Sequence, residues 1–167
     1  MCHRKNLYII GGTMGVGKTT TCEYLKSKLD NAVFLDGDWC WYSDPFQVTD
    51  ETKKMVVDNI CYLINNYIHC SAYENIIFCW VMHEQNIIDD ILSRLDTGKC
   101  KTKIISLVCR EDKLIMRLKK DVRDGKREND VISRSADRLD LYNRLNTIKI
   151  DVSDIAAEEA AEIIVKL

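Results

Sequence analysis

The chain has 167 residues, of which 46% are hydrophobic, enough to form the core of one domain spanning residues 1–167. Its 24 Lys and Arg residues nearly balance 26 Asp and Glu residues, which gives a formal net charge of -2. This balance argues against a dedicated surface for nucleic acid or anionic membranes, because such surfaces need an excess of basic residues. No apolar run approaches the roughly 20 residues that span a bilayer, and the run near the N-terminus is too short for a secretory signal.

In chain order, short apolar runs alternate with segments of helical periodicity. The apolar runs predict five strands, at 7–10, 32–35, 76–82, 103–109 and 147–152. The helical segments begin at residue 18 and continue at 49–67, 84–95, 111–126, 131–145 and 156–166. The cap of the second helix is either Thr49 or Asp50. Apolar strands that alternate with helices predict an α/β fold whose parallel sheet is covered on both faces.

The chain holds eight cysteines, and no two of them have the C-x-x-C spacing of metal sites and redox motifs. Several lie inside apolar stretches, such as Cys79 in the segment IIFCWV. We therefore expect reduced thiols, mostly buried, as in a cytoplasmic protein, and no metal site built from cysteine.

The first predicted strand runs into GGTMGVGKTT, in which Gly12-x-x-x-x-Gly17-Lys18-Thr19 fits the Walker A pattern between a strand and a helix. Glycines let backbone N–H groups turn inward as an anion-binding nest, and the helix N-terminus adds its dipole. Lys18 reaches the β- and γ-phosphates of a nucleotide, and the Thr19 hydroxyl is a ligand for Mg²⁺. The residues expected to hold the nucleotide are Gly12, Thr13, Gly15, Val16, Gly17, Lys18, Thr19 and Thr20.

Two other classes of phosphate-loop protein lack their signatures in this sequence. A GTPase needs an Asn-Lys-x-Asp motif to read guanine, and the sequence contains none. A large oligomeric ATPase of the AAA type needs an Asp-Glu pair at the end of an apolar strand, whereas the candidate strand has His83 in place of that Asp. The chain is also too short for such a module together with its helical lid domain.

The segment FLDGDW, at 34–39, places Asp36 and Asp38 two residues apart at the end of the second strand. This carboxyl edge is where doubly wound sheets bind ligands. A phosphoryl-transfer enzyme uses one carboxylate to organise Mg²⁺ and another to accept the proton of the acceptor hydroxyl. The alternative is a solvated Asp-Gly-Asp turn, but the position after a Walker A helix favours the functional interpretation.

GGTMGVGKTT, LDGD, an arginine-rich helix and a late IDVSD together resemble the small P-loop kinases, a group that includes the shikimate, gluconate, adenylylsulfate, chloramphenicol and nucleoside-monophosphate kinases. The resemblance extends over nearly the whole chain. It implies a three-layer P-loop NTPase fold with strand order 2-3-1-4-5 and a helical lid at about 117–134. Carried over residue by residue, Thr19 and Asp36 bind Mg²⁺ and Asp38 contacts the acceptor. Which of the two Asp residues acts as the base is left open.

The lid falls on RLKKDVRDGKREND, at 117–130, a segment dense in arginine and lysine. A guanidinium bridges phosphate oxygens, offsets charge as the phosphoryl group moves, and stacks on adenine. We expect Arg117, Arg123 and Arg127 to take part in catalysis, and the alternative is a solvated face of a charged helix. Residue 121 is Asp, which departs from the R-x-x-x-R pair of the gluconate type, so individual roles are not assigned.

A group of aromatic residues follows Asp38, namely Trp39, Trp41, Tyr42 and Phe46. These rings either stack on a planar or sugar-like acceptor or pack beneath the next helix, and the sequence favours neither. His83 either contacts the acceptor or relays a proton, or it is a structural histidine. The residues expected to bind the acceptor are Asp38, Trp39, Trp41 and His83.

We therefore expect a cytoplasmic kinase that uses Mg²⁺ and moves the γ-phosphate of ATP to a small molecule, such as a nucleotide, a sugar acid or an antibiotic hydroxyl. Lys18, Asp36, Asp38 and the lid arginines would carry the chemistry. The resemblance of the C-terminal IKIDVSD segment to the same kinases implies that 151–154 pass near adenine. The alternative is a non-catalytic or regulatory module that closes its lid on ATP. The expected partner is the small-molecule acceptor, without nucleic acid or membrane, and the protein is a monomer or a homodimer.

Overall fold

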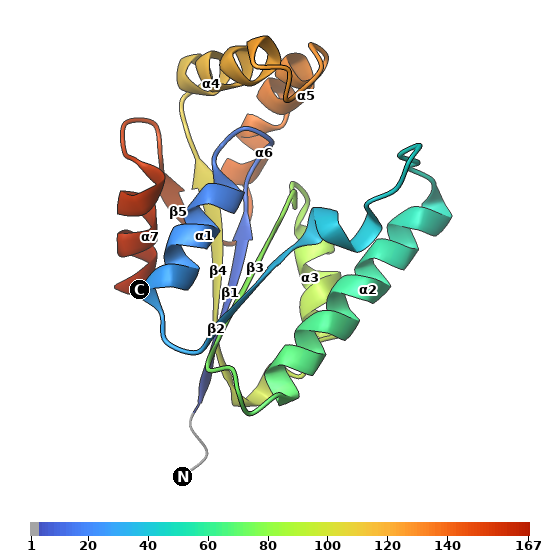
Figure 1. The fold of residues 1–167 in the computed structure, drawn as a ribbon, viewed down its shortest axis with the longest axis vertical. Helices are drawn as coiled ribbons and strands as arrows, with labels where there is room; N and C mark the ends of the chain where they lie inside the picture. Colours follow the sequence, from blue (N-terminus) through green and yellow to red (C-terminus); the bar gives the residue numbers. More distant parts are fainter. Residues whose placement is uncertain (1–3) are drawn as a thin grey trace.

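Five parallel strands form the centre of the protein in the computed structural model, which describes residues 4–167 (Figure 1). The strands are β1 (Lys5–Gly11), β2 (Ala32–Asp36), β3 (Asn75–Trp80), β4 (Cys100–Val108) and β5 (Ile148–Asp151). They are hydrogen-bonded in the order β2-β3-β1-β4-β5, and every neighbouring pair is parallel. The predicted fold class and strand order are therefore confirmed.

Helices cover both faces of this sheet (Figure 1). On one face, α1 (Lys18–Lys28) packs beside α7 (Ala157–Val165), and on the other lie α2 (Asp50–His69) and α3 (Gln85–Ser93). Beyond the carboxyl end of the sheet lie α4 (Glu111–Arg123) and α5 (Val131–Asp137), and α6 (Leu139–Asn143) leads back to β5. Two short 3₁₀ helices complete the chain, η1 (Gly37–Trp41) and η2 (Thr97–Lys99).

Alternate residues of each central strand enter two separate hydrophobic cores. In β1, Tyr8 and Ile10 join the core on the α1 and α7 face, whereas Leu7 and Ile9 join the core on the α2 and α3 face. All four side chains are at most 2% exposed. Burial on both faces explains why the strand sequences are apolar throughout, and it leaves the carboxyl edge of the sheet for ligands.

Two local features differ from the sequence prediction. The single helix expected over 131–145 is divided at Arg138 into α5 and α6. The segment after Asp36 was not predicted as a helix, but it forms η1, whose first turn is closed by the Asp36 side chain accepting from the Asp38 amide. Of the two caps predicted for α2, Thr49 and Asp50, the helix uses Thr49, whose hydroxyl accepts a hydrogen bond from the Thr52 amide at 3.1 Å.

The seven cysteines within the described part of the chain are free thiols, and five of them are buried. Cys2 lies outside the described residues. Between residues 4 and 167, no helix combines the length and the apolar character that crossing a membrane requires.

Candidate functional site

The P-loop, residues 12–19, joins β1 to α1 and depends on glycine for its shape. Gly15 and Gly17 have φ angles of 81° and 106°, in the left-handed region that glycine adopts without strain. A Cβ on Gly15 would overlap the Leu118 side chain of α4, whereas one on Gly17 would meet no atom within 4 Å. Gly17 is also the N-cap of α1 and provides no capping side chain, so the first amides of this helix are available to an anion.

The Lys18 side chain folds back across the P-loop, and its Nζ donates to the Thr13 carbonyl at 3.0 Å. Burial lowers the pKa of Lys18, and the neighbouring Cys79, Asp38 and Asp36 oppose that shift. The positive charge of Arg127 adds to the lowering of this pKa. Lys18 therefore lies within electrostatic range of both predicted carboxylates and of one predicted lid arginine.

Asp36, at the end of β2, meets Thr19 of the P-loop directly. The Thr19 hydroxyl donates to Asp36 Oδ2 at 2.7 Å, and Asp36 Oδ1 accepts from the Asp38 amide at 3.1 Å. Asp36 is only 7% exposed, so its carboxylate is held in one place. A hydroxyl and a carboxylate side by side form an oxygen donor set of the kind that Mg²⁺ prefers, so these residues fit the metal that the sequence predicts.

Asp38 is exposed, and it is held from the neighbouring strand by a residue that sequence reasoning missed. Trp80, at the end of β3, donates its indole N–H to Asp38 Oδ1 at 3.2 Å. The same ring lies close over Gly37, where an added Cβ would be 2.5 Å from Trp80 Cγ. Trp80 belongs to the apolar run that predicted β3, and no local signal distinguishes it, because its partner is 42 residues away in the chain.

The aromatic residues after Asp38 are divided between packing and exposure. Trp39 contacts Phe34 edge to face with ring centroids 5.2 Å apart, and Trp41 contacts Phe46 and Trp80 in the same way at 5.0 and 5.9 Å. Trp41 is partly buried, while Trp39 and Phe46 remain 56% and 57% exposed. These rings support one another and still present large apolar surfaces beside Asp38.

At the root of the predicted lid, α5 is attached to the P-loop and α6 packs against the end of β1. The buried Thr13 hydroxyl donates to the Ser135 carbonyl of α5 at 3.0 Å. Tyr142 of α6 is fully buried, with its ring against Gly11, and burial raises the pKa of its phenol. No local signal predicts either contact, because the two chain segments are more than 120 residues apart.

His83 lies three residues after Trp80, the last residue of β3. Its Nε2 lies 3.5 Å from Glu84 Oε1, and Nδ1 is buried without a hydrogen-bond partner among residues 4–167. Burial lowers the pKa of His83, the charge of Arg138 lowers it further, and Glu84 opposes both. A role in binding the acceptor stays a prediction.

The three predicted lid arginines occupy different environments. Arg117 of α4 donates to the carbonyls of Val16, Val152 and Ser153, at 3.2, 2.6 and 3.4 Å, and so links the P-loop to the turn after β5. Arg127 donates to Asp121 at 3.1 Å, and Arg123 is largely exposed. Their catalytic roles remain predictions, as does nucleotide contact by Thr20, which is exposed beside Thr19.

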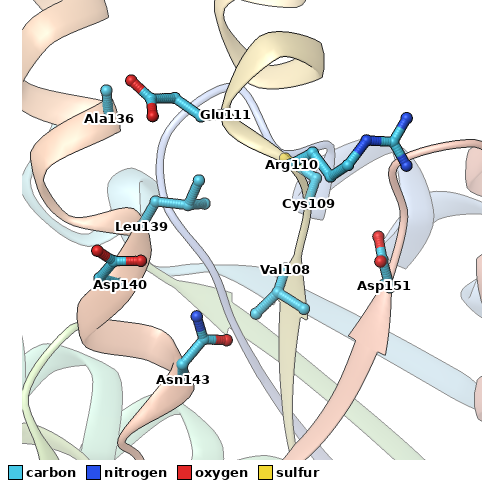
Figure 2. Close-up of a pocket in the computed structure, with 9 residues that line it drawn as sticks. All are labelled: Val108, Cys109, Arg110, Glu111, Ala136, Leu139, Asp140, Asn143 and Asp151. Carbon is cyan, nitrogen blue, oxygen red and sulfur yellow. The ribbon is translucent and has the colours of Figure 1, made fainter.

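A cavity of about 330 Å³ lies where β4 and β5 end, between those strands and α5 and α6 (Figure 2). Its lining includes Cys109, Arg110, Asp140, Asn143 and Asp151, of which Asp151 belongs to the segment 151–154 that is predicted to pass near adenine. In Figure 2 the Arg110 side chain extends away from the cavity, and its guanidinium is paired with Asp154 at 2.7 Å. This cavity therefore borders the predicted adenine segment, and its lining contains none of the predicted catalytic, P-loop or acceptor residues.

Solved structures with the same fold are small P-loop proteins of similar length. The tunicamycin resistance protein of Deinococcus radiodurans has a TM-score of 0.75 at 20% identity, covering 98% of this chain and 95% of that chain. The gluconokinase of Sinorhizobium meliloti has a TM-score of 0.68 at 16% identity, covering 96% and 89%. The APS kinase of Mycobacterium tuberculosis, solved with AMPPNP and APS, has a TM-score of 0.70 at 12% identity, covering 98% and 96%.

A search of curated proteins found no match. Residues 9–140 match a protein family described as an AAA domain, which is well over half of the 167 residues. Within this family description, the strand order and the solved neighbours show that the chain has the kinase-like P-loop architecture. The chain therefore belongs to this AAA domain family and has the P-loop NTPase fold of the small kinases.

Proposed function

We propose that the protein is a kinase that transfers the γ-phosphoryl group of ATP to a hydroxyl group of a small molecule. The observation that carries this proposal is the paired arrangement of two carboxylates at the P-loop. Asp36 contacts Thr19 at 2.7 Å, and Asp38 is held at the same edge of the sheet by Trp80 at 3.2 Å. A module that only binds ATP has no need of the second carboxylate. Kinases among the solved neighbours support the proposal.

The nucleotide would be held by the P-loop amides, by the N-terminus of α1 and by Lys18. Thr19 and Asp36 would hold Mg²⁺, which offsets the negative charge of the phosphates when it is bound. Arg127 is the lid residue whose charge already acts on Lys18, and it would stabilise charge on the transferred group. Arg117 holds α4 on the P-loop, and it would contact adenine through the face of its guanidinium.

Asp38 is the better candidate for the base. Both oxygens of Asp36 accept hydrogen bonds, from Thr19 and from the Asp38 amide, whereas Asp38 uses Oδ1 for Trp80. In the proposed reaction, the acceptor oxygen forms a bond to the γ-phosphorus as the bond from phosphorus to the β,γ-bridging oxygen breaks. ADP leaves, and the proton of the hydroxyl passes to Asp38.

The test is acceptor-dependent transfer from γ-labelled ATP to a panel of nucleosides, sugar acids, shikimate-like acids and hydroxylated antibiotics. We expect Asp38→Asn to lower the transfer rate about 100-fold or more and to leave ATP affinity unchanged. Asp30→Asn, two residues before the start of β2, serves as the matched control and should retain full activity. Undiminished transfer by Asp38→Asn would remove the proposed base. ATP binding without transfer to any acceptor would favour a regulatory module instead.

A further inference from the structure

A second cavity begins one residue after Asp38 and has a volume of about 490 Å³, which is in the range of small-molecule sites. It lies between η1, the loop that follows it and the first half of α2. One wall is connected to the candidate base, because Trp41 contacts Trp80 and the Trp80 indole donates to Asp38. The lining residues are Trp39, Cys40, Trp41, Tyr42, Ser43, Asp44, Pro45, Gln47, Thr52, Met55 and Asn59.

The charge of this cavity is entirely negative. Its lining contains the carboxylate of Asp44 and no Lys, Arg or His. The whole segment 36–52, DGDWCWYSDPFQVTDET, contains five acidic residues and no basic residue. The nearest lysines in sequence, Lys53 and Lys54, are outside the lining and pair with acidic residues of α2 at 3.5 and 4.0 Å.

The thiol of Cys40 reports the same negative environment. Burial, together with the charges of Asp36 and Asp38, raises the pKa of Cys40 to about 11. An anion bound here would lose its hydration and meet further negative charge, without a guanidinium or ammonium group to pair with. Carboxylates and phosphates are therefore poorly suited to this cavity, whereas an ammonium group is favoured.

Three aromatic side chains, Trp39, Trp41 and Tyr42, belong to the lining of this cavity. Tyr42 is 94% exposed, and the exposed faces of Trp39 and Phe46 lie close by in the chain. Exposed aromatic side chains grouped in this way indicate a binding surface, because a ligand that covers them removes apolar surface from water, which is favourable. Gln47 and Asn59 add amide groups, and Asn59 is fixed by donating its Nδ2 to the Cys40 carbonyl at 2.9 Å.

We propose that the acceptor is a ring compound that carries a free hydroxyl and is either uncharged or protonated on an amine, and not a carboxylic acid or a phosphate ester. This inference rests on the proposed function, since it identifies the cavity beside Asp38 as the acceptor pocket. A flat or hydrophobic ring packs against the tryptophans, an amine lies near Asp44, and the hydroxyl points towards Asp38.

The first experiment compares matched pairs that differ in charge: adenosine with its 5′-monophosphate, glucosamine with glucuronate, and the methyl ester of shikimate with shikimate. Binding is followed by tryptophan fluorescence. The chain has three tryptophans, Trp39, Trp41 and Trp80, and all of them line this cavity or contact its wall. We expect the uncharged or amine-bearing member of a pair to bind and to be phosphorylated with a kcat/KM at least about tenfold higher.

Two variants test whether the preference for uncharged or amine-bearing acceptors arises in this cavity. Trp39→Ala should raise the KM for the acceptor about tenfold and leave the KM for ATP unchanged, because only a stacking surface is lost. Asp44→Lys should weaken binding of the amine-bearing compound about tenfold and improve binding of its acidic partner. Tyr62→Ala is the control, since Tyr62 is exposed further along α2 and outside the cavity lining.

The outcomes separate this inference from the proposed function. Transfer to acidic compounds alone would overturn the acceptor class and leave the kinase in place. Failure of every uncharged and amine-bearing compound to bind at millimolar concentration would also overturn it. Binding that follows the expected preference without phosphate transfer would support the pocket chemistry and contradict the kinase.

Discussion

At the scale of single residues, His83 is a half-buried titratable group with an unsatisfied nitrogen. Its Nδ1 has no hydrogen-bond partner in the described part of the chain, and Arg138 adds positive charge nearby. Both burial and Arg138 favour the neutral ring and lower the pKa of His83 below 6.5. A neutral imidazole beside β3 suits hydrogen bonding to an acceptor better than it suits an ion pair.

This lowered pKa predicts how stability depends on pH. Between the folded-state pKa and 6.5, the unfolded chain binds the proton of His83 more tightly than the folded protein does. Stability therefore falls as the pH falls through this window, and the contribution is fully present above it. We expect His83→Gln to show a shallower decline in the free energy of unfolding below pH 6.5, as measured by urea titrations at several pH values. An unchanged decline would contradict the assignment.

At the scale of secondary-structure elements, η1 is held in place by the close approach of β3. Gly37 lies beneath the Trp80 ring, and a Cβ there would be 2.5 and 2.6 Å from two ring carbons. These are shorter than any normal contact, so either the indole or η1 has to move when a side chain is added. Either movement would disturb the hydrogen bond between Trp80 and Asp38.

We expect Gly37→Ala to lower the free energy of unfolding by about 1–3 kcal/mol, the range of an overpacked interior. Phosphate transfer should fall as well, because Asp38 loses its support. Gly98→Ala is the matched control, since a Cβ at Gly98 would meet no atom within 4 Å, and a change within about 0.5 kcal/mol is expected there. Chemical denaturation of both variants measures the difference. Equal stabilities would show that the Trp80 side chain moves aside without a cost in free energy.

The sequence predicted the elements well, because their signals are local. Periodicity located every strand and most helices, and the resemblance to small kinases supplied the strand order. Contacts between distant segments were not predictable in this way. Trp80 looks like any other apolar strand residue, and Arg117 looks like any other lid arginine until its guanidinium is seen on the carbonyls of Val16 and Val152. The segment 131–145 contains no glycine or proline that would indicate its division at Arg138.

At the scale of the whole molecule, the proposed nucleotide would join parts of the chain that are far apart. The P-loop, Asp36 and the lid come from opposite halves of the sequence, and a ligand that binds only the folded state stabilises all of them together. The stabilisation that a charged ligand provides should be smaller when the Mg²⁺ that holds the ligand is removed.

We expect ATP with Mg²⁺ to raise the midpoint of thermal unfolding by about 5–10 °C when free ATP exceeds its Kd about 100-fold. Chelation with EDTA should reduce this rise substantially, and Asp36→Asn should do the same in the presence of Mg²⁺. Lys18→Ala should abolish it and leave the fold intact. Differential scanning fluorimetry measures all four conditions, with Asp30→Asn as the unaffected control. A full rise in EDTA would argue against a metal at Thr19 and Asp36.

The bond from Thr13 to Ser135 has a mechanical consequence. It fixes one root of the predicted lid to the P-loop, while Leu118 against Gly15 and Arg117 on Val16 fix the other root. With both hinges clamped to the same loop, we expect little rotation of the lid as a whole. The part left to travel is the tip at 124–130, which carries Arg127. Nucleotide exchange would then require the lifting of a short flap.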